Sequence, residues 1–191
     1  MFSSALNFLL TTLASLLTLL FLLRFFMQLF KASFRNPLGQ MVMSLTDFAV
    51  KPARKLIPSL GKIDCSTLLL AFLTQLLLQI GLLWLRGLPF SIEDHSAWPS
   101  LIGLSLIGVL HACLDLFFYA LLLQAVLSWV NPHNPISAVL DSLTKPILDP
   151  IRRFLPAAGG IDFSPLVAMI FLQMLNVSIV KTLESQLLTI F

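Results

Sequence analysis

Charged residues are scarce in this chain. Of its 191 residues, only 11% are Asp, Glu, Lys or Arg, whereas 58% are hydrophobic. In soluble globular domains about a quarter of the residues are charged, so the composition excludes a domain whose solvent is water. The chain is predicted to be an integral membrane protein.

Motifs that carry chemistry are also missing. The two cysteines, Cys65 and Cys113, fall about half a chain apart and are predicted to be free thiols. The sequence has no Gly-rich phosphate loop, no metal-spaced His or Cys cluster and no nucleophile motif. We therefore expect no catalytic residues, no cofactor and no metal site, and we assign His95 and His133 to solvated loops.

Long apolar runs are what the sequence does contain. A helix needs roughly 20 apolar residues to cross the hydrocarbon core of a bilayer. The predicted fold class is an all-α membrane protein with four transmembrane helices, over residues about 4–30, 66–86, 102–130 and 164–186.

Basic residues indicate the orientation, because they stay on the cytoplasmic side of span ends. Ten of the twelve fall between or near the ends of spans one and two, or between spans three and four. The middle loop carries Arg86 against Glu93 and Asp94. We expect a multi-pass protein with both bridging segments cytoplasmic and with N-out and C-out termini. The net charge of +3 then reflects topology, and no nucleic-acid partner is expected.

The chain contains an internal repeat. Residues 36–77 align without a gap with residues 134–175, a shift of 98 residues (134 minus 36). The matches include Asn36-Pro37 with Asn134-Pro135, Pro52 with Pro150, and Asp64 with Asp162. Both copies should insert in the same orientation, related by an axis along the membrane normal.

The repeat sets the predicted domain organisation. The first unit is residues 1–88, an outward-facing linker follows over 89–100, and the second unit is residues 101–191. Each unit joins its two spans through one cytoplasmic interfacial helix, over residues about 37–57 and 135–155.

Each bridging segment has apolar residues at helical spacing and basic residues near its end, which predicts an amphipathic surface helix. The candidate contact residues are Arg54, Lys55, Arg152, Arg153 and Phe154. Phospholipid anchoring is one interpretation, since basic side chains reach lipid phosphates. A docking surface for a partner's helix, or a lid over a polar site between spans, is the other.

Local signals predict how these helices begin and break. Asn36 and Asn134, each before a proline, are expected to start them. Prolines inside the segments predict a kinked or two-part helix, with Thr46 and Thr144 capping the second part.

Polar residues also mark the start of the second span in each unit. Ser66 and Ser164 are predicted helix caps. Asp64 and Asp162 lie where a helix N-terminus favours negative charge, and each could pair with Arg54 or Arg152. Ion coordination or catalysis is the alternative role.

Three residues, Arg24, His111 and Asp115, break the repeat inside or beside the bilayer, where the other copy has leucines. His111 and Asp115 lie four apart on one helical face, and ionisable groups in lipid are costly. A proton or ion relay is one interpretation. Pairing of Asp115 with Arg24 across the bundle, or solvation of His111 at the interface, is the other.

The second bridging segment and the span start after it carry a recognisable pattern. The run Thr144-Lys145-Pro146, Pro150-Ile151-Arg152-Arg153, Leu155-Pro156 and Gly159-Gly160-Ile161-Asp162-Phe163-Ser164-Pro165 resembles the signature of the YggT family. The resemblance covers nearly the whole chain, in the two-copy form of proteobacterial members. The first copy departs from the pattern at Lys51, Ala53, Lys55 and 65–67. The second unit is therefore the better candidate for any contact that is shared across the family.

The resemblance implies a bacterial inner membrane location, with relatives in chloroplast membranes. It also implies non-enzymatic roles: osmotic-stress tolerance and potassium uptake, with division, nucleoid organisation or cytochrome assembly among relatives.

We therefore expect a non-enzymatic inner-membrane scaffold or assembly factor that binds phospholipids and a membrane or cell-division partner, in support of osmotic-stress tolerance or envelope homeostasis. The alternative is a small ion channel or transporter subunit, linked to potassium or protons, with a pathway near Asp115 and the repeat interface. A lipid-handling enzyme using Asp162 and Arg152 is a third hypothesis. Homo-oligomerisation stays open.

Overall fold

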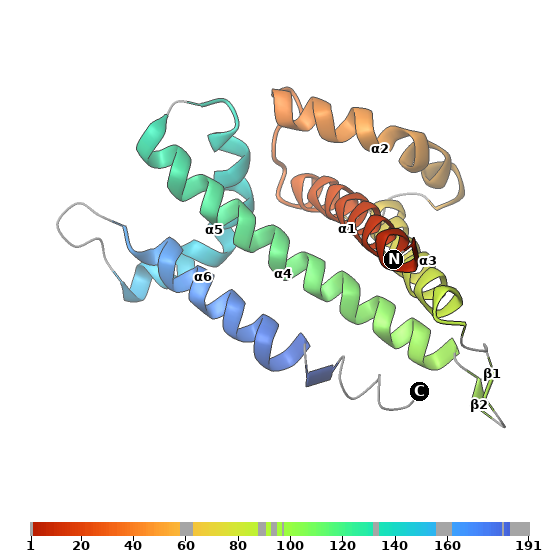
Figure 1. The fold of residues 1–191 in the computed structure, drawn as a ribbon. Helices are drawn as coiled ribbons and strands as arrows, with labels where there is room; N and C mark the ends of the chain where they lie inside the picture. The colour runs from red at the N-terminus through yellow and green to blue at the C-terminus, as the bar shows by residue number, and fades with distance from the viewer. Residues whose placement is uncertain are drawn as a thin grey trace.

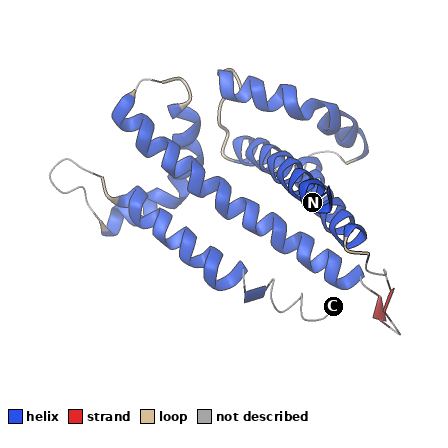
Figure 2. Ribbon diagram, viewed as in Figure 1, coloured by secondary structure: helices blue, strands red, loops and turns tan. Residues whose placement is uncertain are grey.

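The computed structural model describes residues 2–57, 63–87, 91–92, 95–96, 98–131, 134–155, 162–180 and 182–183. The helices in this part of the chain are α1 (Phe2–Leu29), α2 (Pro37–Leu56), α3 (Cys65–Leu85), α4 (Trp98–Val130), α5 (Ser137–Phe154) and α6 (Ser164–Leu175). A π-helix over Asn176–Val180 continues α6, and strands β1 (Ser91–Ile92) and β2 (His95–Ser96) pair antiparallel before α4. The helical fold class is confirmed (Figure 2).

The long helix α4 is the centre of the structure (Figure 1). Helices α1 and α3 pack on each other and on α4, whereas α6 packs on α4 and α5. Helix α2 packs on α1 and α3, and α5 packs on α4 and α6 and also touches α1. Both bridging helices lie at the same end of the bundle, and the paired strands β1 and β2 lie at the other end.

Three helices, α1, α3 and α4, are long and apolar enough to cross a membrane. Ser164–Val180 forms a shorter apolar helix. At about 1.5 Å per residue it covers about 25 Å, somewhat less than the hydrocarbon core of a bilayer. The predicted end of this span, near residue 186, lies outside the described residues. Four spans therefore remain a prediction.

The structure corrects one alternative of a sequence-based prediction, the division of each bridging helix into two parts. Each is a single continuous helix, with Pro52 inside α2 and Pro146 and Pro150 inside α5. The hydroxyls of Thr46 and Thr144 do not cap a second helix part but donate to carbonyls four residues earlier, at 2.6 and 2.8 Å. Both threonines lie on the buried face of their helix, so packing against the spans holds the helix together through the prolines.

The two asparagines differ in what they do. Asn36 caps α2, because its side-chain Oδ1 accepts from the N–H of Gly39 at 2.8 Å. Asn134 instead accepts from the N–H of Ile136 at 2.9 Å, and α5 begins only at Ser137 without a side-chain cap. The predicted start signal thus sets a turn before α5 rather than its first residue.

Candidate functional site

A buried cation links the first span to its bridging helix. Arg24 of α1 is only 5% exposed, and its Nη1 donates to Thr46 Oγ1 and to Asp47 Oδ1 of α2, both at 2.7 Å. Asp47 also pairs with Lys51 at 2.8 Å. The predicted pairing of Arg24 with Asp115 is therefore wrong, because Arg24 lies near the bridging-helix end of α1, within reach of α2.

The second repeat makes the same link without a cation. Gln124 of α4 contacts the Thr144 hydroxyl and donates to the Asp141 carboxylate, both on α5. Thr144 is the repeat equivalent of Thr46. In both copies, a polar side chain near the end of the first helix therefore holds the bridging helix through the same threonine position.

A second link joins each bridging helix to the helix that follows it. Arg54 pairs with Asp64, with Nε 3.1 Å from Oδ2, and Arg152 pairs with Asp162, with Nη2 2.8 Å from Oδ2. Arg54 also donates to Gln28 of α1 at 2.8 Å. The four residues take part in ion pairs at matching positions, so each bridging helix is fixed at its C-terminal end.

The predicted serine caps at Ser66 and Ser164 are wrong. Asp64 is the N-cap of α3, with Oδ1 3.4 Å from the N–H of Thr67, while the Ser66 hydroxyl donates to the Ile57 carbonyl. Asp162 Oδ1 accepts from the N–H of Ser164 at 2.9 Å, and the Ser164 hydroxyl is buried without a hydrogen-bond partner. Both serines lie inside the first turn, where a carboxylate two residues earlier is better placed to meet free N–H groups.

The environment of Asp162 favours its charged form. Burial raises its pKa, but hydrogen bonds from Ser164 and Arg152 outweigh that effect, and the pKa lies below its ordinary value. The carboxylate is thus held as the anionic partner of Arg152. It is engaged in a structural ion pair, as Asp64 is in the first copy.

The remaining predicted contact residues lie outside these ion pairs. Lys55 and Arg153 are exposed, and neither has an ion pair within the described part of the chain. Each precedes an apolar side chain at the helix end: Leu56 is 84% exposed and Phe154 is 86% exposed. The two copies therefore present the same combination of one cation and one apolar side chain.

A polar cluster lies near the midpoint of α4. His111 Nε2 is 3.2 Å from Asp115 Oδ2, and Asn176 donates from Nδ2 to Asp115 Oδ1 at 3.2 Å. Asn176 is the first residue of the π-helix, and its own Oδ1 is buried without a partner. Such π-helical turns occur frequently at functional sites.

Two residues in these networks, Asp47 and Asn176, were missed by sequence reasoning. Asn176 had a signal, since it is a polar residue inside an otherwise apolar run. Asp47 stands where the second copy has Lys145, so the repeat gave no reason to pair it. Among the described residues, no group of three His, Cys, Asp or Glu side chains is placed to hold a metal ion.

Each copy contains two apolar helices and a bridging helix that polar contacts hold at both ends. This arrangement defines a duplicated helical membrane protein. The chain belongs to the CCB3/YggT family, whose model matches residues 3–85 and 103–183. The two matches coincide with the two repeats.

Relatives of similar length are found in several bacteria, and a shorter relative is found in Galdieria sulphuraria. An uncharacterized protein YggT of Escherichia coli strain K12 is 36% identical over 192 residues, 95% of this chain and 93% of the relative. An uncharacterized protein PA0392 of Pseudomonas aeruginosa strain PAO1 is 37% identical over 187 residues, 96% and 92% of the two chains. An uncharacterized protein ycf19 of Galdieria sulphuraria is 31% identical over 83 residues, 42% of this chain and 81% of the relative. No solved structure matches the chain.

Proposed function

We propose that this protein is a non-enzymatic scaffold of the bacterial inner membrane, with both bridging helices on the cytoplasmic surface and both termini outside. Helices α2 and α5 bind phospholipid headgroups and a membrane or cell-division partner, in support of osmotic-stress tolerance or envelope homeostasis. The asymmetric distribution of ten of the twelve basic residues supports this orientation.

The observation that carries the proposal is the matched pair of helix ends. Leu56 beside Lys55, and Phe154 beside Arg153, occupy equivalent positions and are both exposed. An apolar side chain next to a cation suits the boundary between acyl chains and phosphates. Arg54 and Arg152, engaged with Asp64 and Asp162, position these ends rather than bind lipid themselves.

Helix α2 adds a longer apolar face. Phe48 is exposed, and it shares one side of the helix with Pro52 and Leu56 by the helical repeat. The polar residues Gln40, Asp47 and Arg54, which are spaced seven apart, lie toward another side. This arrangement supports a helix lying parallel to the membrane surface with its apolar side toward the acyl chains.

We predict that Lys55→Glu combined with Arg153→Glu weakens capture of anionic lipid. Each basic residue near a membrane surface contributes about 1 kcal/mol of attraction, so each reversal should lower capture at least fivefold, or roughly 1 kcal/mol. The measurement is photocrosslinking of reconstituted protein to an anionic phospholipid probe. Lys145→Glu is the matched control, because Lys145 lies on the opposite side of α5 from Phe154. Equal losses in the control and the test variant would show that the helix ends have no special role.

The partner-binding part of the proposal needs a separate experiment. A photoreactive amino acid at Phe48 or at Phe154, in the full chain within native membranes, should yield one reproducible protein adduct in addition to lipid adducts. The same probe at Gln40, which is exposed on the polar side of α2, should not. If both apolar positions gave lipid adducts alone, these helices would bind lipid and no partner protein.

A second candidate function, a proton or cation pathway, is favoured by the cluster of Asp115, His111 and Asn176. An intramembrane carboxylate bonded to a residue of a π-helical turn is unusual for a helix that only fills space.

We predict for this second function that purified protein in liposomes carries a proton or potassium flux that Asp115→Asn abolishes. The substitution keeps the side-chain size and removes the charge. If Asp115 had only a structural role, the flux of Asp115→Asn would be nearly the same as that of the unaltered protein. Asn176→Leu, which introduces the residue of the other repeat, should reduce the flux as well. Liposomes with no flux in the unaltered protein would leave the scaffold as the only function.

A further inference from the structure

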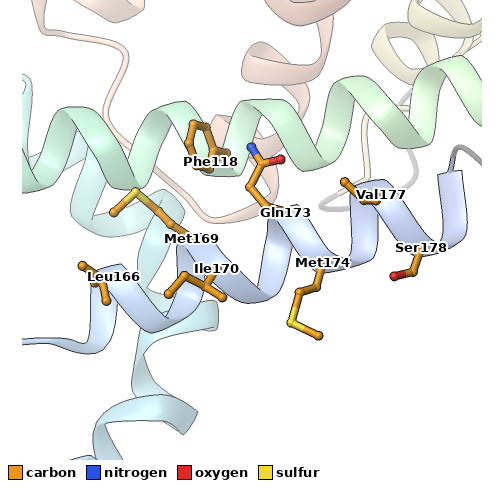
Figure 3. Close-up of a pocket in the computed structure, with 8 residues that line it drawn as sticks. All are labelled: Phe118, Leu166, Met169, Ile170, Gln173, Met174, Val177 and Ser178. Atoms are coloured by element: carbon orange, nitrogen blue, oxygen red, sulfur yellow. The ribbon is translucent and has the colours of Figure 1, made fainter.

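The outer face of α6 carries an open apolar groove of about 620 Å³. Seven of its lining residues come from α6 and its π-helical extension, and Phe118 comes from α4 (Figure 3). Exposed apolar side chains are ordinary on a helix in lipid, so exposure alone says nothing about an occupant. The internal repeat indicates the occupant, because it shows what covers the same face in the first copy.

In the first copy, this face is the interface between the repeats. Ala71 packs in a cluster with Ala112 and Cys113 of α4, while Leu76 and Ile80 pack against Leu83 and Leu101. A Cβ at Gly108 would stand 2.6 Å from Gln75 Oε1, so α3 and α4 approach closely there. The repeat equivalents of the α3 residues Ala71, Gln75, Leu76 and Ile80 are Met169, Gln173, Met174 and Ser178, and all four line the groove.

Helix α1, at the opposite edge of the molecule, exposes the surface that α4 buries at the interface between the repeats. The α4 residues that pack against the cluster containing Ala71, namely Val109, Ala112 and Cys113, correspond to Thr11, Ala14 and Ser15 of α1. Thr11 and Ser15 are exposed, and Asn7 continues their side of the helix at a spacing of four. Small and polar residues at this spacing are typical of helix contacts inside membranes.

The bridging helices repeat the same asymmetry. Val139 and Leu143 of α5 are buried in a cluster with Met27 and Ala32, at the end of α1. Their equivalents on α2, Met41 and Leu45, are 49% and 48% exposed. Val130, the equivalent of Ala32 at the end of α4, is also exposed.

We propose that the α6 groove and the end of α4 bind a second copy of this chain through the α1 and α2 edge of that copy. The contact continues the interface that already joins the two repeats, so its partner surface is specified by the same sequence. It is a head-to-tail contact, which closes into a ring when the rotation allows it. On α2 it uses Met41 and Leu45, and it leaves the helix ends at Leu56 and Phe154 free for the lipid and partner contacts.

The register of the internal interface gives the position to test. Gln75 lies opposite Gly108, and Ala71 shares a hydrophobic cluster with Cys113, as expected for antiparallel helices. The repeat equivalents of Ala71 and Cys113 are Met169 and Ser15. Leu10, the equivalent of Gly108, is a poorer choice because it already lies close to Gly81 of α3.

The experiment uses two differently tagged versions of the full chain, expressed in one membrane, with Cys65 and Cys113 replaced by serine. One version carries Ser15→Cys and the other Met169→Cys. A short bismaleimide should then give a product that carries both tags. Phe171→Cys, exposed on the other side of α6, is the matched control and should lose that product.

A second pair keeps the test decisive if one variant inserts poorly. Leu45→Cys with Val130→Cys probes the same contact at the bridging-helix end and should also give the two-tag product. Ser15→Cys linking to itself, or to Phe171→Cys as strongly as to Met169→Cys, would overturn the proposal. So would the absence of a two-tag product from both pairs in variants that insert at normal levels.

Discussion

Replacing Asp47 with alanine is expected to destabilise the protein by about 3 kcal/mol, because it leaves a buried guanidinium without its counter-ion. Arg24 is 5% exposed, and of its two acceptors on α2 only the Thr46 hydroxyl would remain after the substitution. The loss should appear as a lower unfolding midpoint in lipid nanodiscs, accompanied by faster proteolysis of α2.

The matched test is the double variant Arg24→Leu with Asp47→Ala. Leucine is the residue of the other repeat at this position, so it suits a helix of this kind. Arg24→Leu alone should cost less than Asp47→Ala, since Asp47 is partly exposed and keeps Lys51. Adding Arg24→Leu to Asp47→Ala should therefore recover much of the lost stability. A double variant less stable than Asp47→Ala would show that the guanidinium is not the source of the loss.

The same carboxylate gives a pH dependence of known sign. Hydrogen bonds from Lys51 and Arg24 hold the pKa of Asp47 below its ordinary value of 3.8. A carboxyl group with a lowered folded pKa contributes its full stability above the ordinary pKa and loses it as the pH falls through the folded pKa. The stability difference between the unaltered protein and Asp47→Ala should thus be constant near neutral pH and shrink only in strong acid.

Much of the fold could be predicted from the sequence because hydropathy and the repeat report on large, cooperative features. Uncharged runs placed α1 and α3 to within a few residues. The start of α4 at Trp98 was placed later, near 102, because Pro99 and the preceding polar linker obscured it. The prolines of α2 and α5 were expected to kink the helices or divide them in two, since the sequence shows the missing donor but not the packing that compensates for it.

A polar contact could be predicted from the sequence only where both partners recur in the two copies. Arg54 with Asp64 and Arg152 with Asp162 could be foreseen, because both members recur at the same spacing. Arg24 with Asp47 could not, because neither partner recurs in the second copy. Asn176 was missed for the same reason: its equivalent is Leu78, and its partner Asp115 is 61 residues away in sequence.

The second large effect is expected at Asp64, where Asp64→Asn should cost about 2 kcal/mol, the usual range for losing a hydrogen bond to a charged group inside a protein. Asparagine is about the same size and remains a good N-cap residue, so the substitution removes the ion pair and little else. Asp64 is 0% exposed, and its partner Arg54 also holds Gln28 of α1. Loss of the pair loosens α2 from α1 and α3 together.

Asp162→Asn is the matched control, and the repeat makes the comparison unusually direct. The side chain of Asp162 is 36% exposed, and that of Arg152 is 46% exposed, so solvent screens their attraction. Gln28 has Val126 as its equivalent, and Arg152 therefore lacks a third partner there. Asp162→Asn should cost about 0.5 kcal/mol, the usual value for an exposed pair. Equal losses at both sites, measured by the same unfolding assay, would mean that burial does not decide the strength of these ion pairs, and the two bridging helices would then be held equally firmly.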